Sequence, residues 1–282
     1  MKRAALINDL SGFGKCSLTA AIPVISVMGI QACPLPTAVL TAQTGFESYY
    51  CDDFTDRMDI FTEEWKKMKV SFDGIYSGFL ANAGQIEKVL HFLEVFQGED
   101  TLFLADPVLG DHGETYGVFS KELLMGMKKL TLQATVITPN LTELCLLADE
   151  NYEALTACRQ ESDYLDKIRV ICDKLLRKAQ TKQTIIVTGI IQEKEDGSYV
   201  GNMAVSNQDS FYVETPYTGK GFSGTGDLFA SVICGSLLKG LSVREAVQKA
   251  TFFLQEAIED ASKENMPSVH GVHFEKYLSR LL

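Results

Sequence analysis

Short runs of apolar residues recur along the chain, and each run ends at a glycine, proline, asparagine or aspartate. The runs are rich in β-branched residues and do not alternate with polar ones, which is typical of strands that are covered on both faces. We therefore predict strands near residues 4–7, 74–78, 101–107, 135–140 and 184–189.

The segments between these runs have helical spacing. Residues 85–93, for example, carry apolar side chains at positions 86, 89, 90 and 93, which lie along one stripe of a helix. Alternating strands and helices predict an α/β fold with a mostly parallel sheet and helices on both faces. Ligands bind such sheets at the carboxyl ends of the strands. The polar residues that follow the runs are Asp9, Ser77, Asp106, Asp111, Thr138, Asn140, Glu143 and Thr188.

Two stretches depart from this rhythm. Residues 31–50 contain two prolines and then a Gln-Thr-Gly stretch, which predict one or two strands leading into a mobile loop. Residues 197–215 alternate weakly around the turn-forming residues 207–210, which predicts an antiparallel hairpin added to the parallel sheet. No repeat or linker divides the chain, so we expect a single domain over residues 1–282.

The composition argues against several classes of protein. Acidic residues outnumber basic ones by 37 to 26, and the net charge of −11 argues against general affinity for nucleic acid. The seven cysteines include no Cys-x-x-Cys pair, which argues against a disulfide framework or a zinc site. The first apolar run is too short for a signal peptide, and no run is long enough to span a membrane. We expect a cytoplasmic protein in which affinity for phosphate is confined to one site.

The strongest local motif is Gly-Thr-Gly-Asp at residues 224–227, which precedes a long apolar segment of helical spacing. Its glycines let the backbone turn tightly against a ligand. Unpaired amides at the start of the following helix form an anion site suited to phosphate. Asp227 would repel a phosphate there unless it accepts a proton from an attacking hydroxyl, as a general base does. The alternative is that Asp227 only complements the helix dipole.

Two glycine-rich stretches match nucleotide-binding motifs incompletely. Residues 219–224 fit Gly-x-Gly-x-x-Gly, but no strand ending in an acidic residue follows, which argues against a dinucleotide fold. Residues 12–17 follow the first strand, but a P-loop requires glycine where Asp9 stands and Ser or Thr where Cys16 stands. Asp9 either points into a pocket beside this loop or caps the helix predicted near residue 15.

Acidic residues also follow two neighbouring strands. Asp106 and Asp111 come after one strand and Glu143 after the next, and converging oxygen donors suit Mg²⁺ that carries a nucleoside triphosphate. Each has a simpler alternative, since Asp106 can satisfy backbone groups at a strand end and Asn140 with Glu143 can begin a helix. The histidines at 270 and 273 flank a glycine and lie near the C-terminal end of the sequence, so we interpret them as surface residues and not as a metal pair.

In chain order these motifs resemble the ribokinase-like superfamily, and within it the vitamin B6 kinases. The resemblance covers essentially the whole chain, and residues 224–227 are its most diagnostic part. Segments 34–37, 43–45 and 76–80 favour the B6 kinases over their relatives. The resemblance implies a three-layer α/β/α sandwich and a homodimer. It also implies transfer of the ATP γ-phosphate to the 5′-hydroxymethyl group of pyridoxal, pyridoxine or pyridoxamine, which are small aromatic alcohols.

The resemblance implies roles for particular residues as well. Asp227 is the expected base, and the amides of Gly224, Thr225 and Gly226 are the expected anion hole. Mg²⁺ is expected at Asp106, Asp111 and Glu143, with K⁺ as a further candidate cation. The implied ATP contacts are Asp111, Tyr116, Thr138, Asn140, Glu143 and Thr188, and charge and position add Lys220. The implied substrate contacts are Asp9, Thr44, Gly45, Ser77 and Asp227.

Asp9 departs from the B6 kinase pattern, in which a serine commonly binds the ring nitrogen. A carboxylate there would pair with a protonated pyridinium, but hydroxymethylpyrimidine kinases of thiamine synthesis also carry an aspartate in this loop. A hydroxymethylpyrimidine or its phosphate is therefore the alternative substrate. An alternative of another class is a non-catalytic sensor of nucleotide or vitamin B6, which would not need the base.

Overall fold

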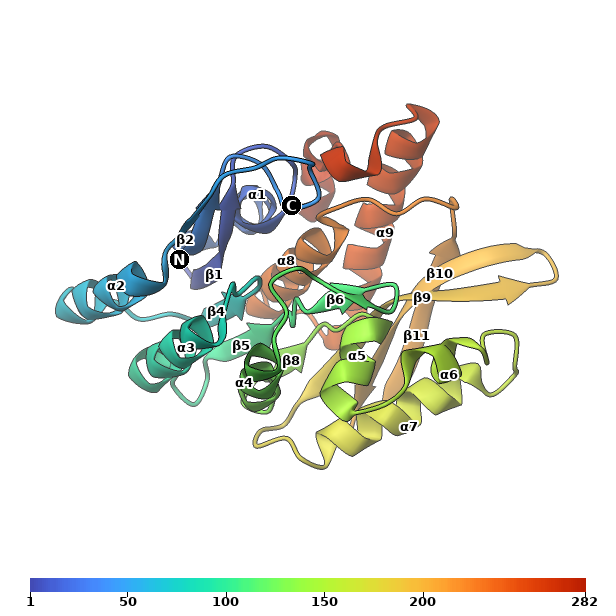
Figure 1. The fold of residues 1–282 in the computed structure, drawn as a ribbon, viewed down its shortest axis with the longest axis horizontal. Coiled ribbons are helices and arrows are strands. Elements are labelled where there is room, and N and C mark those ends of the chain that lie inside the picture. The colour runs from blue at the N-terminus through green and yellow to red at the C-terminus, as the bar shows by residue number, and fades with distance from the viewer.

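A central sheet of nine strands runs through the molecule (Figure 1). The computed structural model describes residues 1–282. Two further short strands, β6 (Gly110–Asp111) and β7 (Glu114–Thr115), form a separate hairpin. The strands of the central sheet are β1 (Arg3–Ser11), β2 (Gln31–Leu40), β3 (Cys51–Asp53), β4 (Gly74–Ser77), β5 (Leu102–Ala105), β8 (Val136–Ile137), β9 (Thr184–Lys194), β10 (Gly197–Ser206) and β11 (Ser210–Pro216).

The order across the sheet is β11-β10-β9-β8-β5-β4-β1-β2-β3. All neighbours from β9 to β2 in this order are parallel, whereas β10 and β11 at one edge and β3 at the other are antiparallel. This arrangement confirms the predicted mostly parallel sheet with a small antiparallel addition. β9 is longer than predicted because its outer part pairs with β10 alone and extends beyond the helices (Figure 1).

β2 contains both prolines of the irregular stretch, Pro34 and Pro36. It pairs with β1 along nearly its whole length, whereas β3 pairs only with residues 38–40. The first part of β2 is therefore an open edge, where a proline removes no hydrogen bond from the sheet. Residues 41–50 then form the predicted loop.

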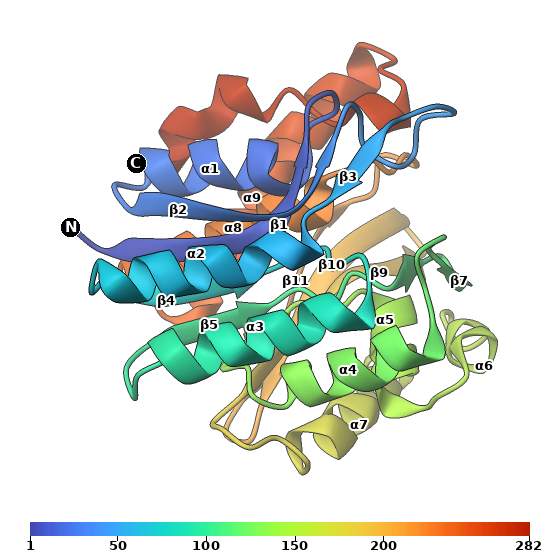
Figure 2. The same ribbon diagram turned by 60° about the vertical axis from the view of Figure 1, so that its left-hand side comes forward.

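Helices cover both faces of the sheet, as Figure 2 shows. One face carries α2 (Thr55–Lys67), α3 (Ala83–Phe96), α4 (Lys121–Thr131), α5 (Leu141–Ala148) and α7 (Tyr164–Leu176), with the short α6 (Tyr152–Thr156) beside them. The other face carries α1 (Ser17–Val27), α8 (Thr225–Leu238), α9 (Val243–Lys263) and the turns η1 (Ser268–His270) and η2 (Phe274–Leu281). The result is the three-layer α/β/α sandwich that the resemblance implied.

Each face of the sheet forms its own apolar core. In β1, Ala5 and Ile7 belong to the core on the side of α3 and α4, whereas Ala4 and Leu6 belong to the core on the side of α1 and α8. Because neither face of the inner strands meets water, their sequences show unbroken apolar runs instead of alternation. Each large side chain buried in this way contributes about 1.5–3 kcal/mol of transfer free energy.

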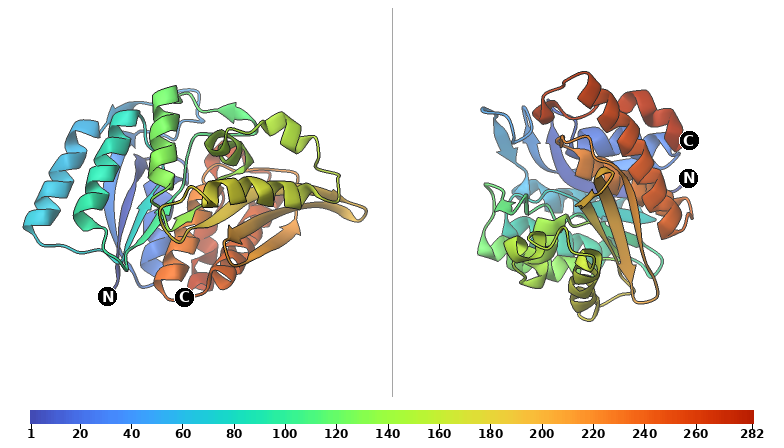
Figure 3. Two further views of the ribbon diagram at one scale, coloured as in Figure 1. Left: turned by 90° about the horizontal axis from the view of Figure 1, so that it is seen from below. Right: turned by 90° about the vertical axis from the view of Figure 1, so that its right-hand side faces the viewer.

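The two chain ends lie near each other on one side of the molecule (Figure 3). This proximity arises because η2 packs against α1 and α9, and α1 in turn packs against β1. All seven cysteines are free thiols. None of the helices combines the length and the hydropathy that crossing a bilayer requires.

Candidate active site

The carboxyl ends of the parallel strands open onto a cleft of about 690 Å³. The start of α8, the β6–β7 hairpin and one side of α9 complete its walls. Predicted catalytic, nucleotide and metal residues therefore share one site, as the strand-end argument requires. Those that line it are Asp106, Asp111, Tyr116, Thr138, Asn140, Glu143, Thr188, Lys220, Gly224, Thr225, Gly226 and Asp227.

Four predicted substrate contacts do not line this cleft. Asp9 and Ser77 are buried at the ends of β1 and β4, whereas Thr44 and Gly45 belong to the loop of residues 41–50. That loop is bound at Gln43, whose Oε1 accepts from the Gly45 amide at 2.8 Å and whose Nε2 donates to a carbonyl of η1 at 3.0 Å. The loop therefore lies against the C-terminal turns.

Gly224 forms the turn that begins α8, as the motif predicts. Its φ of +80° lies in the left-handed region, and a Cβ there would overlap the carbonyl oxygen of Lys15. Glycine is therefore required at this position. The first amides of α8, beginning at Thr225, have no acceptor within the helix, and their dipoles make this turn electropositive. It is suited to bind an anion in the cleft.

Asp227 lies in the first turn of α8, in the wall of the cleft. Its Oδ1 accepts a hydrogen bond from Nδ2 of Asn8 at 3.0 Å. Burial raises the pKa of Asp227 to about 6, and Asp9 adds to the rise, while the Ser17 amide and the side chains of Asn8 and Tyr76 oppose it. A carboxylate with a near-neutral pKa is suited to accept a proton.

Asp106, directly after β5, is buried and accepts a hydrogen bond from the Thr138 hydroxyl at 2.8 Å. Burial raises the pKa of Asp106 to about 7, and the nearby Asp227 raises it further, whereas Thr138 lowers it. The two carboxylates therefore favour a proton or a cation between their charges. The acidic residues are nevertheless dispersed, since no three His, Cys, Asp or Glu side chains are grouped closely enough to hold a metal ion by themselves.

Asn140 and Glu143 begin α5 as a capping box, so the simpler alternative for this pair is correct. The Glu143 amide donates to Asn140 Oδ1 at 3.0 Å, and Glu143 Oε2 accepts from the Asn140 amide at 2.9 Å. Glu143 Oε1 also accepts from the Leu109 amide at 3.1 Å. Because both carboxylate oxygens already bind backbone amides, Glu143 is better suited to contact a metal through water than directly.

The proposed helix cap at Asp9 is wrong. α1 begins at Ser17 and has no side-chain cap, and the Asp9 carboxylate instead accepts from the Ser11 hydroxyl at 2.7 Å. Burial raises the pKa of Asp9, while hydrogen bonds from Ser17 and Ser11 oppose the rise. Asp9 is therefore a buried carboxylate near Asp227 with no basic partner.

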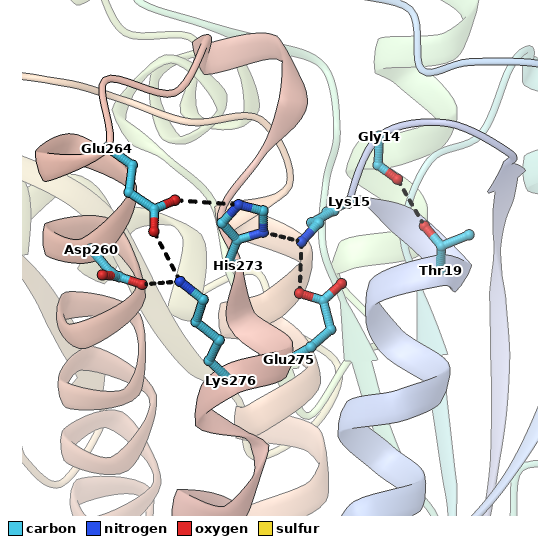
Figure 4. Close-up of polar contacts among 8 residues, drawn as sticks. All are labelled: Gly14, Lys15, Thr19, Asp260, Glu264, His273, Glu275 and Lys276. Atoms are coloured by element: carbon cyan, nitrogen blue, oxygen red, sulfur yellow. Dashed lines mark hydrogen bonds and ion pairs between the residues drawn. The ribbon is translucent and has the colours of Figure 1, made fainter.

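Residues 268–275, here called the C-terminal strap, contact the loop between β1 and α1 (Figure 4). Lys15 Nζ lies 2.8 Å from His273 Nδ1 and 2.7 Å from Glu275 Oε2. His273 Nε2 lies 3.5 Å from Glu264, which also binds Lys276 at 3.0 Å. His273 is thus a partly exposed residue, as the sequence predicted, but it also belongs to a network of charged side chains, which the sequence did not predict.

The C-terminal strap also contacts the turn before α8. The Ser223 amide donates to the Ser268 carbonyl at 3.0 Å. A Cβ on Gly271 would lie 3.0 Å from Cβ of Lys15 and 3.1 Å from the Ser223 carbonyl oxygen, so the backbones pack closely here. The Gly224 turn is therefore supported by both the first loop of the chain and its last residues.

Several residues of the site were not predicted from the sequence. Asn8 lies in the last part of β1, directly before Asp9, and the sequence pattern marks it only as the end of an apolar run. That position at a strand end is the signal that identifies both. Cleft-lining residues without a motif include Arg159, Asn202, Thr215 and Thr251.

Known proteins were compared with the chain. The family model described as phosphomethylpyrimidine kinase matches residues 14–272. A candidate phosphomethylpyrimidine kinase from Bacteroides thetaiotaomicron, crystallised with pyridoxal, is 38% identical and has a TM-score of 0.90, with 99% of this chain and 95% of that chain covered. Pyridoxal kinase from Lactobacillus plantarum is 25% identical with a TM-score of 0.88, covering 100% of this chain and 97% of that chain.

A curated relative matches over a smaller part of its length. Pyridoxal kinase PdxY from Histophilus somni is 25% identical over 195 residues, which are 66% of this chain and 63% of that protein. The chain therefore spans less than two thirds of this relative.

Proposed function

This chain belongs to the phosphomethylpyrimidine kinase family, which groups it with the ribokinase-like vitamin B6 kinases, and from that premise we propose that it phosphorylates a B6 vitamer with ATP. The acceptor is the 5′-hydroxymethyl group of pyridoxal, pyridoxine or pyridoxamine. The observation that carries the proposal is Asp227 directly behind the Gly224 turn, in one cleft with the predicted nucleotide residues. The relative crystallised with pyridoxal supports the choice of substrate.

Asp227 acts as the general base. As the acceptor oxygen bonds the γ-phosphorus, the bond from that phosphorus to the bridging oxygen of ADP breaks, and the hydroxyl proton passes to Asp227. The amides of Gly224, Thr225 and Gly226 bind the oxygens of the transferring group, on which negative charge is spread. The chain thus positions the reactants and stabilises charge without covalent chemistry.

The nucleotide residues are assigned from their places in the cleft wall. Thr188 lies in β9 just beyond the part that pairs with β8, and it bridges to Asn140, which follows β8, so the two residues come from neighbouring strands. Tyr116 lies beyond the β6–β7 hairpin and is 43% exposed, where it can cover the nucleotide. Lys220 lies 5.3 Å from the Phe222 ring and binds the Met266 carbonyl, so it would have to release that carbonyl to contact a phosphate.

The acidic residues fit a metal that arrives with the nucleotide. Asp106 is buried without a basic partner, and its pKa is raised first by this burial and then by the charge of Asp227, both of which a cation would offset. Asp111 contributes a half-exposed carboxylate, and Glu143 a water-mediated contact. Mg²⁺ bound with ATP would neutralise part of the phosphate charge. K⁺ is the candidate for a second, monovalent site.

The substrate ring is assigned to the other side of Asp227, toward Asp9, Ser77 and the loop that contains Thr44 and Gly45. A hydroxymethylpyrimidine or its phosphate is the second candidate acceptor. The buried carboxylate of Asp9 favours it, because this residue is typical of that branch of the family and can bind a ring nitrogen or amino group. The description of the matching family model supports it too.

The experiment is a panel of acceptors scored by ADP release from MgATP. The panel contains pyridoxal, pyridoxine, pyridoxamine, hydroxymethylpyrimidine and its phosphate. Turnover with a vitamer supports the proposal, turnover with the pyrimidines alone replaces it with the second candidate, and no turnover with any acceptor refutes both. Asp227→Asn should lower kcat by about 10²–10⁴-fold while nucleotide binding persists.

We also propose a homodimer that forms through the β3 edge of the sheet. β3 is the last strand, and the neighbouring Tyr49 and Tyr50 are 43% and 68% exposed, an unusual pair at an open edge. Light scattering should give twice the chain mass of 31.1 kDa for the wild type, and Tyr50→Glu should shift it toward the monomer. A monomeric wild type would contradict this assembly.

A further inference from the structure

Asn8 is fully buried, with 0% of its surface exposed, at the carboxyl end of β1. Its Oδ1 accepts hydrogen bonds from the amides of Asp9 at 3.0 Å and Phe79 at 2.8 Å. Two backbone donors thus determine which end of the Asn8 amide is oxygen. The nitrogen end must face the remaining neighbour, and Nδ2 lies 3.0 Å from Oδ1 of Asp227.

Gly78 provides the space for this amide. A Cβ on Gly78 would lie 2.6 Å from Cγ of Asn8, and the Gly78 amide donates to the Ile7 carbonyl at 2.9 Å. The ends of β1 and β4 and the start of α8 therefore meet at the Asn8 side chain. A larger residue at position 78 would displace it.

Asn8 is the side chain that orients Asp227 by a hydrogen bond. The Tyr76 hydroxyl is also buried close enough to lower the pKa of Asp227, but it makes no hydrogen bond of normal geometry. The other charged neighbours of Asp227, Asp9 and Asp106, are carboxylates and cannot donate when ionised. No salt bridge reaches Asp227, so a neutral amide performs this task.

We propose that Asn8 is a positioning residue for phosphoryl transfer, which orients the carboxylate of Asp227 toward the acceptor hydroxyl. The proposal rests on the proposed function. With Oδ1 bound by Asn8, Oδ2 takes the hydroxyl proton as the acceptor oxygen bonds the γ-phosphorus and the phosphorus bond to ADP breaks. The two other hydrogen bonds of Asn8, from the amides of Asp9 and Phe79, hold its side chain in place. Through Asn8 they fix the position of Asp227 relative to the predicted substrate side of the site.

The test replaces Asn8 with aspartate. Asn8→Asp has the same shape and keeps an acceptor for both backbone amides. It replaces the donor that faces Asp227 with a carboxylate oxygen. We expect kcat to fall about 10²-fold, the cost of misplacing a catalytic group, while KM for ATP changes little. The melting temperature should fall by about 4 °C, because two buried acceptors face each other. Asn151→Asp, the same change at the surface cap of α6, is the matched control and should leave both values unchanged.

A double variant separates the hydrogen bond from the chemistry. Asn8→Asp combined with Asp227→Asn restores a donor and an acceptor in reversed order, so the melting temperature should recover while kcat stays at the level of Asp227→Asn. A wild-type kcat for Asn8→Asp, or no recovery of melting temperature in the double variant, would overturn the proposal. If the wild type itself releases no ADP with any acceptor, the proposed function fails, and the melting temperatures separately support or overturn the contact between Asn8 and Asp227.

Discussion

Replacing Gly224 with alanine introduces a methyl group where the backbone of the β1–α1 loop lies. The Cβ would overlap the carbonyl oxygen of Lys15 and lie 2.8 Å from its carbonyl carbon and 3.0 Å from Cα of Cys16. The φ of +80° alone costs an L-residue roughly 1–2 kcal/mol. Because the obstructing atoms are backbone, relief requires moving the loop or the turn, which adds about 1–3 kcal/mol. We therefore expect Gly224→Ala to lower the free energy of unfolding by about 2–5 kcal/mol.

Gly240 provides the matched control for the conformational part of this cost. Its φ is +89°, and no atom lies within 4 Å of the position that a Cβ would take. Gly240→Ala should therefore cost only the roughly 1–2 kcal/mol of the left-handed conformation. Urea denaturation followed by far-UV circular dichroism gives both free energies, and their difference measures the clash at Gly224.

The same substitution tests whether the turn is part of the catalytic machinery. A displacement of about 1 Å in the anion-binding amides should lower kcat by about 10²-fold. ADP release from folded protein at low temperature measures it, with Gly240→Ala as the active control. If Gly224→Ala unfolds at the same urea concentration as Gly240→Ala and keeps the wild-type kcat, both the steric and the positioning arguments are refuted.

Four further predictions concern charged groups. ADP release should fall about tenfold between pH 7.5 and pH 5, because the pKa of Asp227 is raised to about 6 and the base must be ionised; a flat profile contradicts this. As the pH falls over the same range, the melting temperature of the wild type should rise relative to that of Asp227→Asn, because a raised pKa means that the folded state binds the proton more tightly than the unfolded chain. A relative fall in the melting temperature would contradict this. EDTA should weaken binding of a fluorescent ATP analogue at least tenfold, and added Mg²⁺ should restore it, whereas metal-independent affinity would remove the role of Asp106. Lys15→Met should lower kcat by about threefold to tenfold, because the C-terminal strap loses its charged contacts with the loop behind the turn, whereas Arg280→Met, which changes only the contact between η2 and α9, should not.

The sequence predicted where the strands and helices of this fold lie better than it predicted which strands pair with each other. Unbroken apolar runs identified the parallel strands because both faces of the sheet are covered, and the motif at residues 224–227 located the start of α8. The order of strands depends on pairings between distant segments, which local spacing does not encode. The full length of β9 was missed for this reason, since only β10 supports its outer part.

The candidate site was predicted in part for the same physical reason. Residues directly after strands, such as Asp106 and Asn140, came together because strand ends meet at one edge of the sheet. The contact between Lys15 and His273 joins residues 258 positions apart, and no local pattern predicts it. The hydrogen bond of Asn8 to Asp227 spans 219 positions and likewise required the structure.

The C-terminal strap makes the folding of the anion-binding turn depend on a segment that is synthesised long after the turn's other support. The loop that contains Lys15 is made before the strap, and Val272 and Phe274 of the strap are themselves buried in the core with α1, α8 and α9, so neither that core nor the anion-binding turn is complete until the strap has been made. A chain that lacks residues 268–275 would therefore have an unsupported Gly224 turn and an incomplete apolar core. Loss of the strap should reduce catalysis and stability together.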